Sequence, residues 1–129
     1  MIVKEISDKK EIEKVLFDPE IYERIKISDI KPELPTDNTR YIAGYYKGEL
    51  IGIVVYYVRK EFTTCHIQVL KAHRAALAVK FARMALKLTD AKVLYTNIPK
   101  KFEDVVRFAK YFDFKLLEEK NNILIFKRG

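Results

Sequence analysis

The sequence predicts an α/β domain with a mixed β-sheet and few helices. Its 129 residues suit one domain, residues 1–129, and 49% of them are hydrophobic, which is enough for a packed core. Apolar runs with the alternation typical of strands recur along the chain. Between residues 61 and 98 a strand, a helix and a strand follow one another. Such units pair their two strands in parallel, with a right-handed crossover.

The first part of the chain predicts one strand and two short helices. Residues 2–6, IVKEI, alternate as a strand, and Asp8 is placed to cap the first helix. Asp18-Pro19 ends that helix, because the residue before a proline disfavours helical geometry, and a second helix is expected to begin there. Residues 28–40 hold two prolines and several turn formers, so they form the longest expected loop.

The middle of the chain predicts three successive strands. Residues 41–46 are rich in β-forming side chains and run into Lys47-Gly48, a dipeptide that indicates a hairpin. The next stretch, ELIGIVVYYV (49–58), is almost continuously apolar, which is typical of a strand in the centre of a sheet. Residues 61–70, EFTTCHIQVL, provide the following strand.

The last part of the chain predicts two helices between strands. A long helix is expected over residues 74–88, after the basic stretch KAHR, and a strand over residues 91–98. A proline-started helix follows over residues 99–112. The chain then closes with a hairpin around Asn121-Asn122.

Positive charge is concentrated in one region. The net charge is +7, which favours anionic partners without choosing among them. The excess gathers over residues 71–92, where six basic residues face a single acid, Asp90. These six are Lys71, Arg74, Lys80, Arg83, Lys87 and Lys92.

Several function classes lack their motifs in this sequence. It has no P-loop, no G-x-S-x-G, no metal-ligand spacing and no aromatic run of the RNP type. We therefore expect no metal site. The single cysteine, Cys65, is interpreted as a small buried residue of a strand. No apolar run reaches 18 residues and the first residues lack a signal-peptide pattern, so a cytoplasmic protein without membrane contact is expected.

Three stretches carry a resemblance to a known family. A strand runs through a basic turn into a helix as HIQVLKAHRAALA, and VLYTNIP and VVRFAKYFDF follow. With the element order of nearly the whole chain, they resemble the GCN5-related N-acetyltransferase (GNAT) superfamily, and within it the small phage-encoded branch. The resemblance implies a GNAT-like α/β (α+β) fold: a mixed, mostly antiparallel sheet with a central parallel strand pair and helices on both faces.

The resemblance also implies a site for acyl-CoA. In such proteins the fourth and fifth strands separate and the ligand lies between them. Its pantetheine arm would pair with the backbone of Gln68, Val69 and Leu70. Its pyrophosphate would meet amides of the turn and the next helix, with Lys71 and His73 adding positive charge. The amides implied are those of Arg74, Ala75, Ala76, Leu77, Ala78 and Val79.

The chain departs from the family pattern at two places. Glycines are usual in the turn, where phosphates approach the backbone closely. Depending on the alignment, alanines 76 and 78 or the larger Leu77 and Val79 stand there instead. A tyrosine that protonates the departing thiolate in many members is replaced by Ala109, and Tyr111 lies two positions out of register.

His66 is the candidate base. It lies on the strand that would border the acyl group, and transfer to an amine requires a neutral amine. Gln68 shares its face by strand alternation. A half-buried histidine that makes one hydrogen bond in the sheet is the alternative interpretation, and the sequence leaves it open.

The function implied is an acyl-CoA-dependent N-acetyltransferase with acetyl-CoA as co-substrate and no metal. It would pass the acetyl group directly to an unidentified amine approaching from the side of residues 20–40, and GNAT proteins often form homodimers. Two alternatives stay open: a catalytically degenerate GNAT-fold phage accessory or head-assembly protein, in the host cytoplasm or on the virion, and, with less support, a small basic nucleic-acid-binding protein.

Overall fold

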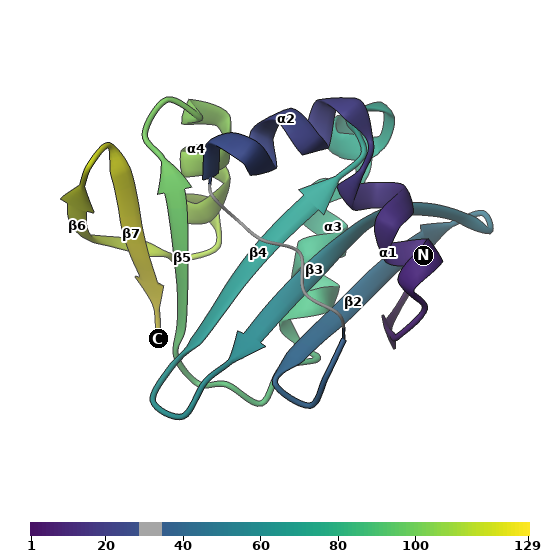
Figure 1. Ribbon diagram of the computed structural model, residues 1–129, viewed down its shortest axis with the longest axis horizontal. Helices are drawn as coiled ribbons and strands as arrows, with labels where there is room; N and C mark the ends of the chain where they lie inside the picture. The colour runs from purple at the N-terminus through teal and green to yellow at the C-terminus, as the bar shows by residue number, and fades with distance from the viewer. Residues whose placement is uncertain (29–34) are drawn as a thin grey trace.

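The computed structural model describes residues 1–28 and 35–129. Its elements confirm the expected order of strands and helices (Figure 1). They are β1 (Ile2–Ile6), α1 (Lys9–Leu16), α2 (Pro19–Ser28), β2 (Thr39–Tyr46), β3 (Glu49–Val58), β4 (Thr63–Val69), α3 (Lys71–Leu86), β5 (Leu94–Pro99), α4 (Glu103–Tyr111), β6 (Lys115–Lys120) and β7 (Ile123–Arg128). Residues 29–34 of the loop expected at residues 28–40 lie outside the described residues.

The strands of the described chain form one seven-stranded sheet in the order β1-β2-β3-β4-β5-β7-β6. The β4–β5 pair is parallel and the other pairs are antiparallel, which confirms the expected mixed sheet. The two expected hairpins are also confirmed. Lys47 and Gly48 have φ of 52° and 79°, and Asn121 and Asn122 have φ of 53° and 65°. Positive φ at both central residues matches the right-handed twist of the flanking strands.

Several element boundaries differ from those the sequence predicts. Helix α3 begins at Lys71 and not at residue 74, because KAH contains no helix breaker and continues the helix directly from Leu70. Strand β5 begins at Leu94 and extends through Pro99, which pairs with Ile123. The last helix therefore begins only at Glu103, four residues after the proline expected to open it.

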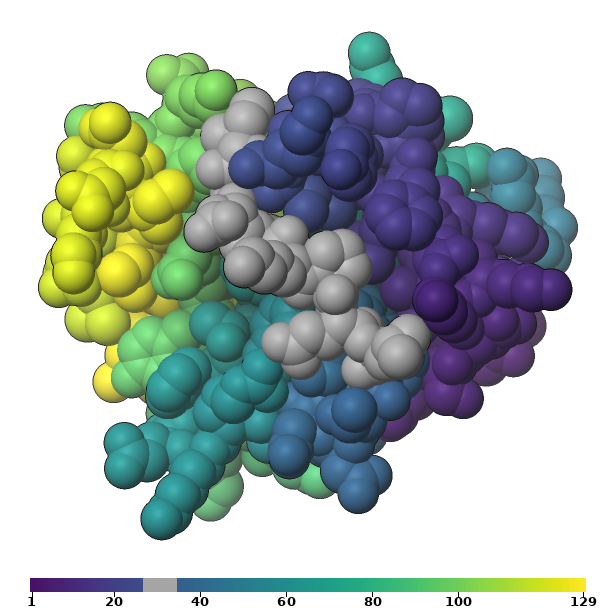
Figure 2. All heavy atoms as spheres, viewed as in Figure 1, coloured from purple at the N-terminus to yellow at the C-terminus, as the bar shows by residue number. Residues whose placement is uncertain are grey.

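Helices cover both faces of the sheet. Helices α1 and α2 lie on one face, and α3 and α4 lie on the other (Figure 1). Side chains of β2 and β3 alternate between the two cores: Ile42 and Val54 pack with α3 and α4, whereas Ala43 and Val55 pack with α1 and α2. On the α1–α2 face, the N-terminal segment and the β6–β7 hairpin lie at opposite sides of the molecule (Figure 2).

A close contact with the sheet fixes the position of α3. Phe81 of this helix is fully buried. A Cβ added to Gly44 of β2 would lie 2.7 Å from the Phe81 ring. The neighbouring strand β3 has a second glycine, Gly52, and a Cβ added there would lie 3.3 Å from the same ring. Glycines on two adjacent strands thus leave a flat area of sheet on which the phenyl ring lies.

Replacing Gly44 with alanine should therefore destabilise the fold by about 1–3 kcal/mol, because the ring must move within a packed core. Urea unfolding measures this change. Combining it with Phe81→Leu should cost less than the two single changes together. Gly48→Asn is the control, since its added Cβ meets no atom within 4 Å and asparagine tolerates the positive φ of this turn. An unchanged urea midpoint for Gly44→Ala would contradict the contact.

Candidate functional site

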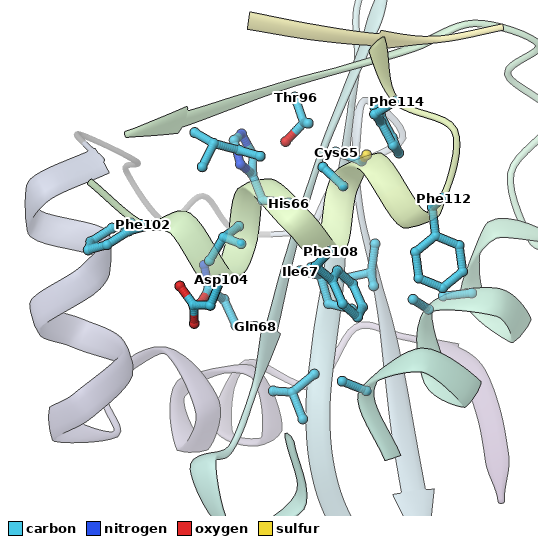
Figure 3. A pocket seen from close by; sticks show the side chains of 18 of the residues that line it. Cys65, His66, Ile67, Gln68, Thr96, Phe102, Asp104, Phe108, Phe112 and Phe114 are labelled. Carbon is cyan, nitrogen blue, oxygen red and sulfur yellow. The ribbon is translucent and has the colours of Figure 1, made fainter. Parts of the chain in front are cut away.

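Strands β4 and β5 separate soon after they meet. Their parallel ladder contains one residue pair, Thr64 with Tyr95, near the start of each strand. Beyond this pair lies a cleft of about 280 Å³, lined by residues 65–69 of β4 and 96–99 of β5. Helices α3 and α4 form its other walls (Figure 3). The separated strands implied by the resemblance are thus present.

The walls of the cleft are mainly apolar. Small side chains of α3, Ala78, Ala82 and Ala85, line one wall at helical spacing. Aromatic side chains line the opposite wall and the inner end (Figure 3). They are Phe102, Phe108, Phe112 and Phe114. Sequence reasoning did not assign this aromatic wall to the site, although the apolar spacing of VVRFAKYF indicates a buried helix face.

The backbone of β4 faces the cleft at alternate residues. The Leu70 amide donates to the Ile51 carbonyl of β3 at 2.8 Å, so Leu70 and, two residues earlier, Gln68 direct their backbone groups to β3. Val69 faces the other way, and its carbonyl accepts from Arg74 Nη2 at 2.9 Å. Gln68, Val69 and Leu70 were expected to pair with a ligand through their backbone. Of these, Val69 directs its backbone groups to the cleft, and the other two direct theirs to β3. Ile67 shares the orientation of Val69 by alternation.

The N-terminus of α3 lies at the end of β4. Leu70 is its N-cap and has no side-chain capping bond, while the His73 amide donates back to the Leu70 carbonyl at 2.9 Å. The amides of Ala75 through Val79 lie inside the helix, where each is directed to the carbonyl four residues earlier. The open amides are therefore those of the first turn, at Lys71 and Ala72, because α3 begins earlier than the sequence predicts.

The side chains expected around the phosphate take different places along α3. Arg74, Ala78 and Val79 line the cleft. Ala75 and Ala76 are exposed, and Leu77 packs against the core on the α3–α4 face of the sheet. The Nε2 atom of His73 lies 3.4 Å from the Glu49 carboxylate.

His66 and Gln68 line the cleft from β4 and also line a smaller hollow on the α1–α2 face. The His66 ring packs edge-on against Tyr57, with ring centroids 5.9 Å apart. Burial lowers the pKa of His66 to about 4, so the imidazole is neutral at pH 7. It can accept a proton or a hydrogen bond, and it borders both the cleft and the opposite face of the sheet.

Two other titratable groups of the cleft are held protonated. Burial raises the pKa of the Cys65 thiol to about 12, which confirms a buried, unreactive cysteine. Burial also raises the pKa of Tyr56, whose hydroxyl donates to the Ala85 carbonyl at 2.9 Å.

Ala109 lines the cleft, whereas Tyr111 is 60% exposed and its hydroxyl accepts from Arg83. Helix α4 therefore presents alanine, and not tyrosine, to the cleft.

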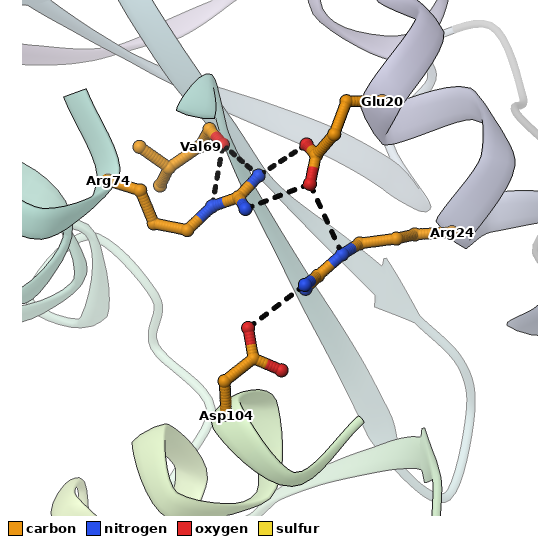
Figure 4. Close-up of polar contacts among 5 residues, drawn as sticks. All are labelled: Glu20, Arg24, Val69, Arg74 and Asp104. Atoms are coloured by element: carbon orange, nitrogen blue, oxygen red, sulfur yellow. Dashed lines mark hydrogen bonds and ion pairs between the residues drawn. The ribbon is translucent and has the colours of Figure 1, made fainter. Parts of the chain in front are cut away.

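Four charged side chains form a chain of ion pairs beside the cleft (Figure 4). The Arg74 guanidinium makes two hydrogen bonds to the Glu20 carboxylate, at 2.6 and 2.9 Å. Arg24 lies 3.4 Å from the same carboxylate and 3.0 Å from Asp104 of α4. The hydrogen bond from Arg74 lowers the pKa of Glu20 against the opposing effect of burial, and the charges of Arg74, Arg24 and Lys71 lower it further.

Residues 1–28 and 35–129 contain neither a metal-binding group nor a membrane-spanning helix. This part of the chain has no group of three or more histidine, cysteine or carboxylate side chains placed to hold a metal ion. None of its helices combines the length and apolarity needed to span a membrane.

No protein-family model matches this sequence, and no curated protein matches it. Solved structures do. The N-acetyltransferase PseH of Campylobacter jejuni, in complex with acetyl coenzyme A, has a TM-score of 0.65 at 13% identity, with 98% of each chain covered. A GNAT-family acetyltransferase of Streptococcus pneumoniae has a TM-score of 0.68 at 15% identity and the same coverage. An N-acetyltransferase of Staphylococcus aureus has a TM-score of 0.68 at 12% identity, covering 99% of this chain and 98% of its own. The chain therefore has the GNAT fold.

Proposed function

We propose that this protein binds acetyl-CoA in the β4–β5 cleft and transfers the acetyl group to an amine. The observation that carries the proposal is the separation of β4 from β5, which opens an apolar cleft ending at the uncapped N-terminus of α3. A protein of the same fold has been solved with acetyl coenzyme A. Within this fold, the HIQVL strand and the RFAKYFDF corner favour the small phage-encoded branch.

The cleft suits the parts of acetyl-CoA in order. The amides of the pantetheine arm would bond the backbone of Val69 and Ile67, while its methylene and methyl groups lie against the alanine and phenylalanine walls. The pyrophosphate would lie at the first turn of α3, where open amides and the positive end of the helix dipole favour anions. Arg74 is placed to contact it.

The chemistry of this proposal is direct transfer. A neutral amine on the α1–α2 face attacks the thioester carbonyl, and the thiolate of CoA leaves. The protein holds both reactants in line. His66, neutral at pH 7, accepts the proton that the attacking nitrogen loses, directly or through one water. Because Ala109 stands where many members have a tyrosine, the thiolate takes its proton from solvent.

A thermal-shift titration with acetyl-CoA tests binding, with adenosine 3′,5′-bisphosphate and a salt series as controls. A ligand at about 100 times its dissociation constant should stabilise the fold by roughly 2.7 kcal/mol. Release of free thiol in the presence of a panel of small amines and peptides with free amino groups then tests transfer. The absence of a shift at millimolar acetyl-CoA would remove the proposal.

Ala109 favours one alternative, a GNAT-fold protein that binds its ligand without turnover and acts through its surfaces. The same two measurements separate it from the enzyme. Binding of acetyl-CoA without thiol release across the amine panel would support the alternative. Thiol release that depends on an amine would support the enzyme.

A further inference from the structure

The ion-pair chain connects three helices at the open end of the cleft. Glu20 and Arg24 come from α2, Arg74 from the first turns of α3, and Asp104 from the first turn of α4. Arg24, Arg74 and Asp104 also line the cleft. Figure 4 shows Glu20 between the two guanidinium groups, on the side of α2. The chain of charges therefore crosses from one wall of the cleft to the other.

Arg74 has both sides of its guanidinium occupied. Its Nε and Nη2 atoms bond the Val69 carbonyl at 3.3 and 2.9 Å, which holds the side chain at the end of β4. Its Nη1 and Nη2 atoms bond Glu20 in the paired geometry that guanidinium also uses with phosphate. A carboxylate of the protein itself, that of Glu20, therefore occupies the anion-binding edge of the Arg74 guanidinium.

Several positive charges surround this carboxylate. Arg24 is the second guanidinium beside Glu20, and the charge of Lys71, the first residue of α3, also acts on it. Both arginine side chains are about one quarter exposed and Glu20 is one third exposed, so water reaches the pair. A partly solvated pair of this kind can exchange its anion, because water replaces much of the lost interaction.

We propose that Glu20 is an internal competitor for the phosphates of the ligand. The inference rests on the proposed binding of acetyl-CoA. As the pyrophosphate reaches the first turn of α3, Arg74 exchanges the Glu20 carboxylate for a phosphate oxygen. The carboxylate then lies close to the added negative charges, which raises the free energy of the bound state. Glu20 thus weakens binding of any ligand that carries phosphates there, and leaves neutral thioesters unaffected.

Affinity measurements on Glu20→Gln test the competition. The change is nearly isosteric and removes one negative charge. By calorimetric titration at constant ionic strength, this variant should bind acetyl-CoA about 5- to 10-fold more tightly than the unaltered protein. Its affinity for S-acetylpantetheine, which has the same thioester arm without phosphates, should be unchanged.

Glu23→Gln is the matched control. It removes the same charge from the same helix, at a side chain that is 72% exposed and pairs with Lys26 at 4.0 Å. It should alter acetyl-CoA affinity by less than about twofold, because exposed charges are screened by salt. A crystal structure of the complex should also show Arg74 on phosphate and no longer on Glu20.

The outcomes separate the two proposals. Equal or weaker acetyl-CoA binding by Glu20→Gln, with clear binding by the unaltered protein, would overturn the competition and leave the proposed function standing. An equal gain with S-acetylpantetheine would also overturn it, since the effect would not involve phosphate. No binding to any of the three proteins would remove both proposals. Binding that appears only in Glu20→Gln would support both.

Discussion

Replacing Ala78 with phenylalanine should strongly weaken acetyl-CoA binding and leave the fold intact. Ala78 lies on α3 with its methyl group toward the cleft, one turn after Arg74. A phenyl ring at this position would occupy the space proposed for the pantetheine arm. The ring can extend into the open cleft, so the packed core beside it need not rearrange. We expect affinity to fall by at least about 100-fold, since displacing the ring would cost several kcal/mol.

Ala76→Phe provides the matched control for this change. Ala76 belongs to the same helix, two residues earlier, but it is exposed and does not line the cleft. The control should bind acetyl-CoA as the unaltered protein does. Calorimetric titration gives the affinities, and far-ultraviolet circular dichroism with urea unfolding checks the fold. Affinities within threefold of each other for the two variants would show that the arm does not lie along α3.

Replacing His66 with glutamine should lower kcat by about 100-fold or more, the usual contribution of a positioned general base. Glutamine keeps a hydrogen-bonding side chain of similar length but cannot take the proton from the attacking nitrogen. The KM for acetyl-CoA should stay unchanged, because the histidine borders the reacting group and not the phosphates. The measurement is steady-state kinetics with the amine found by thiol release. A kcat within threefold of the unaltered value would exclude His66 as the base.

The same variant should also change how stability depends on pH. The pKa of His66 is about 4 in the folded protein and 6.5 in an unfolded chain, so the unfolded state binds more protons between these values. Stability contributed by the neutral histidine is therefore fully present above pH 6.5 and lost as pH falls toward 4. Allowing for water in the cleft, the loss should be about 1–3 kcal/mol.

Urea unfolding across this pH range checks the prediction. His66→Gln should lose less stability than the unaltered protein as the pH falls, and the two curves should run parallel above pH 6.5. Arginine partners lower the pKa of Glu5 and Glu20. The stability that these two carboxylates contribute is therefore lost in acid in both proteins. The difference between the curves therefore isolates the histidine. Equal losses in the two proteins would mean that His66 is not buried as the structure has it.

Local signals predicted much of the fold. The order of elements follows from runs of apolar residues, and the two hairpins follow from dipeptides that tolerate positive φ, Lys47-Gly48 and Asn121-Asn122. The central place of β3 follows from its continuous apolar run, which only a strand covered on both faces can bury. Strand alternation also placed His66 and Gln68 on one face.

The candidate site was predicted less completely. The resemblance implied a ligand between the fourth and fifth strands, and the structure has a cleft there. The turn expected before residue 74 is instead the first turn of α3. Lysine, alanine and histidine are compatible with either state, so the sequence did not distinguish a turn from a helix. The position of the open amides depended on that difference.

The sequence by itself determined which residues form strands and helices, because periodicity, turn dipeptides and helix caps act over a few neighbouring residues. Only the tertiary structure decided how far β4 and β5 separate and which partner Arg74 takes. Glu20 lies 54 residues before Arg74, and the two meet only when α2 and α3 have docked around the sheet. The residues next to an arginine in the sequence do not indicate which acidic residue it will pair with in the folded protein. The charge state of this cleft, and with it the affinity we propose for its ligand, is therefore a property of the folded chain.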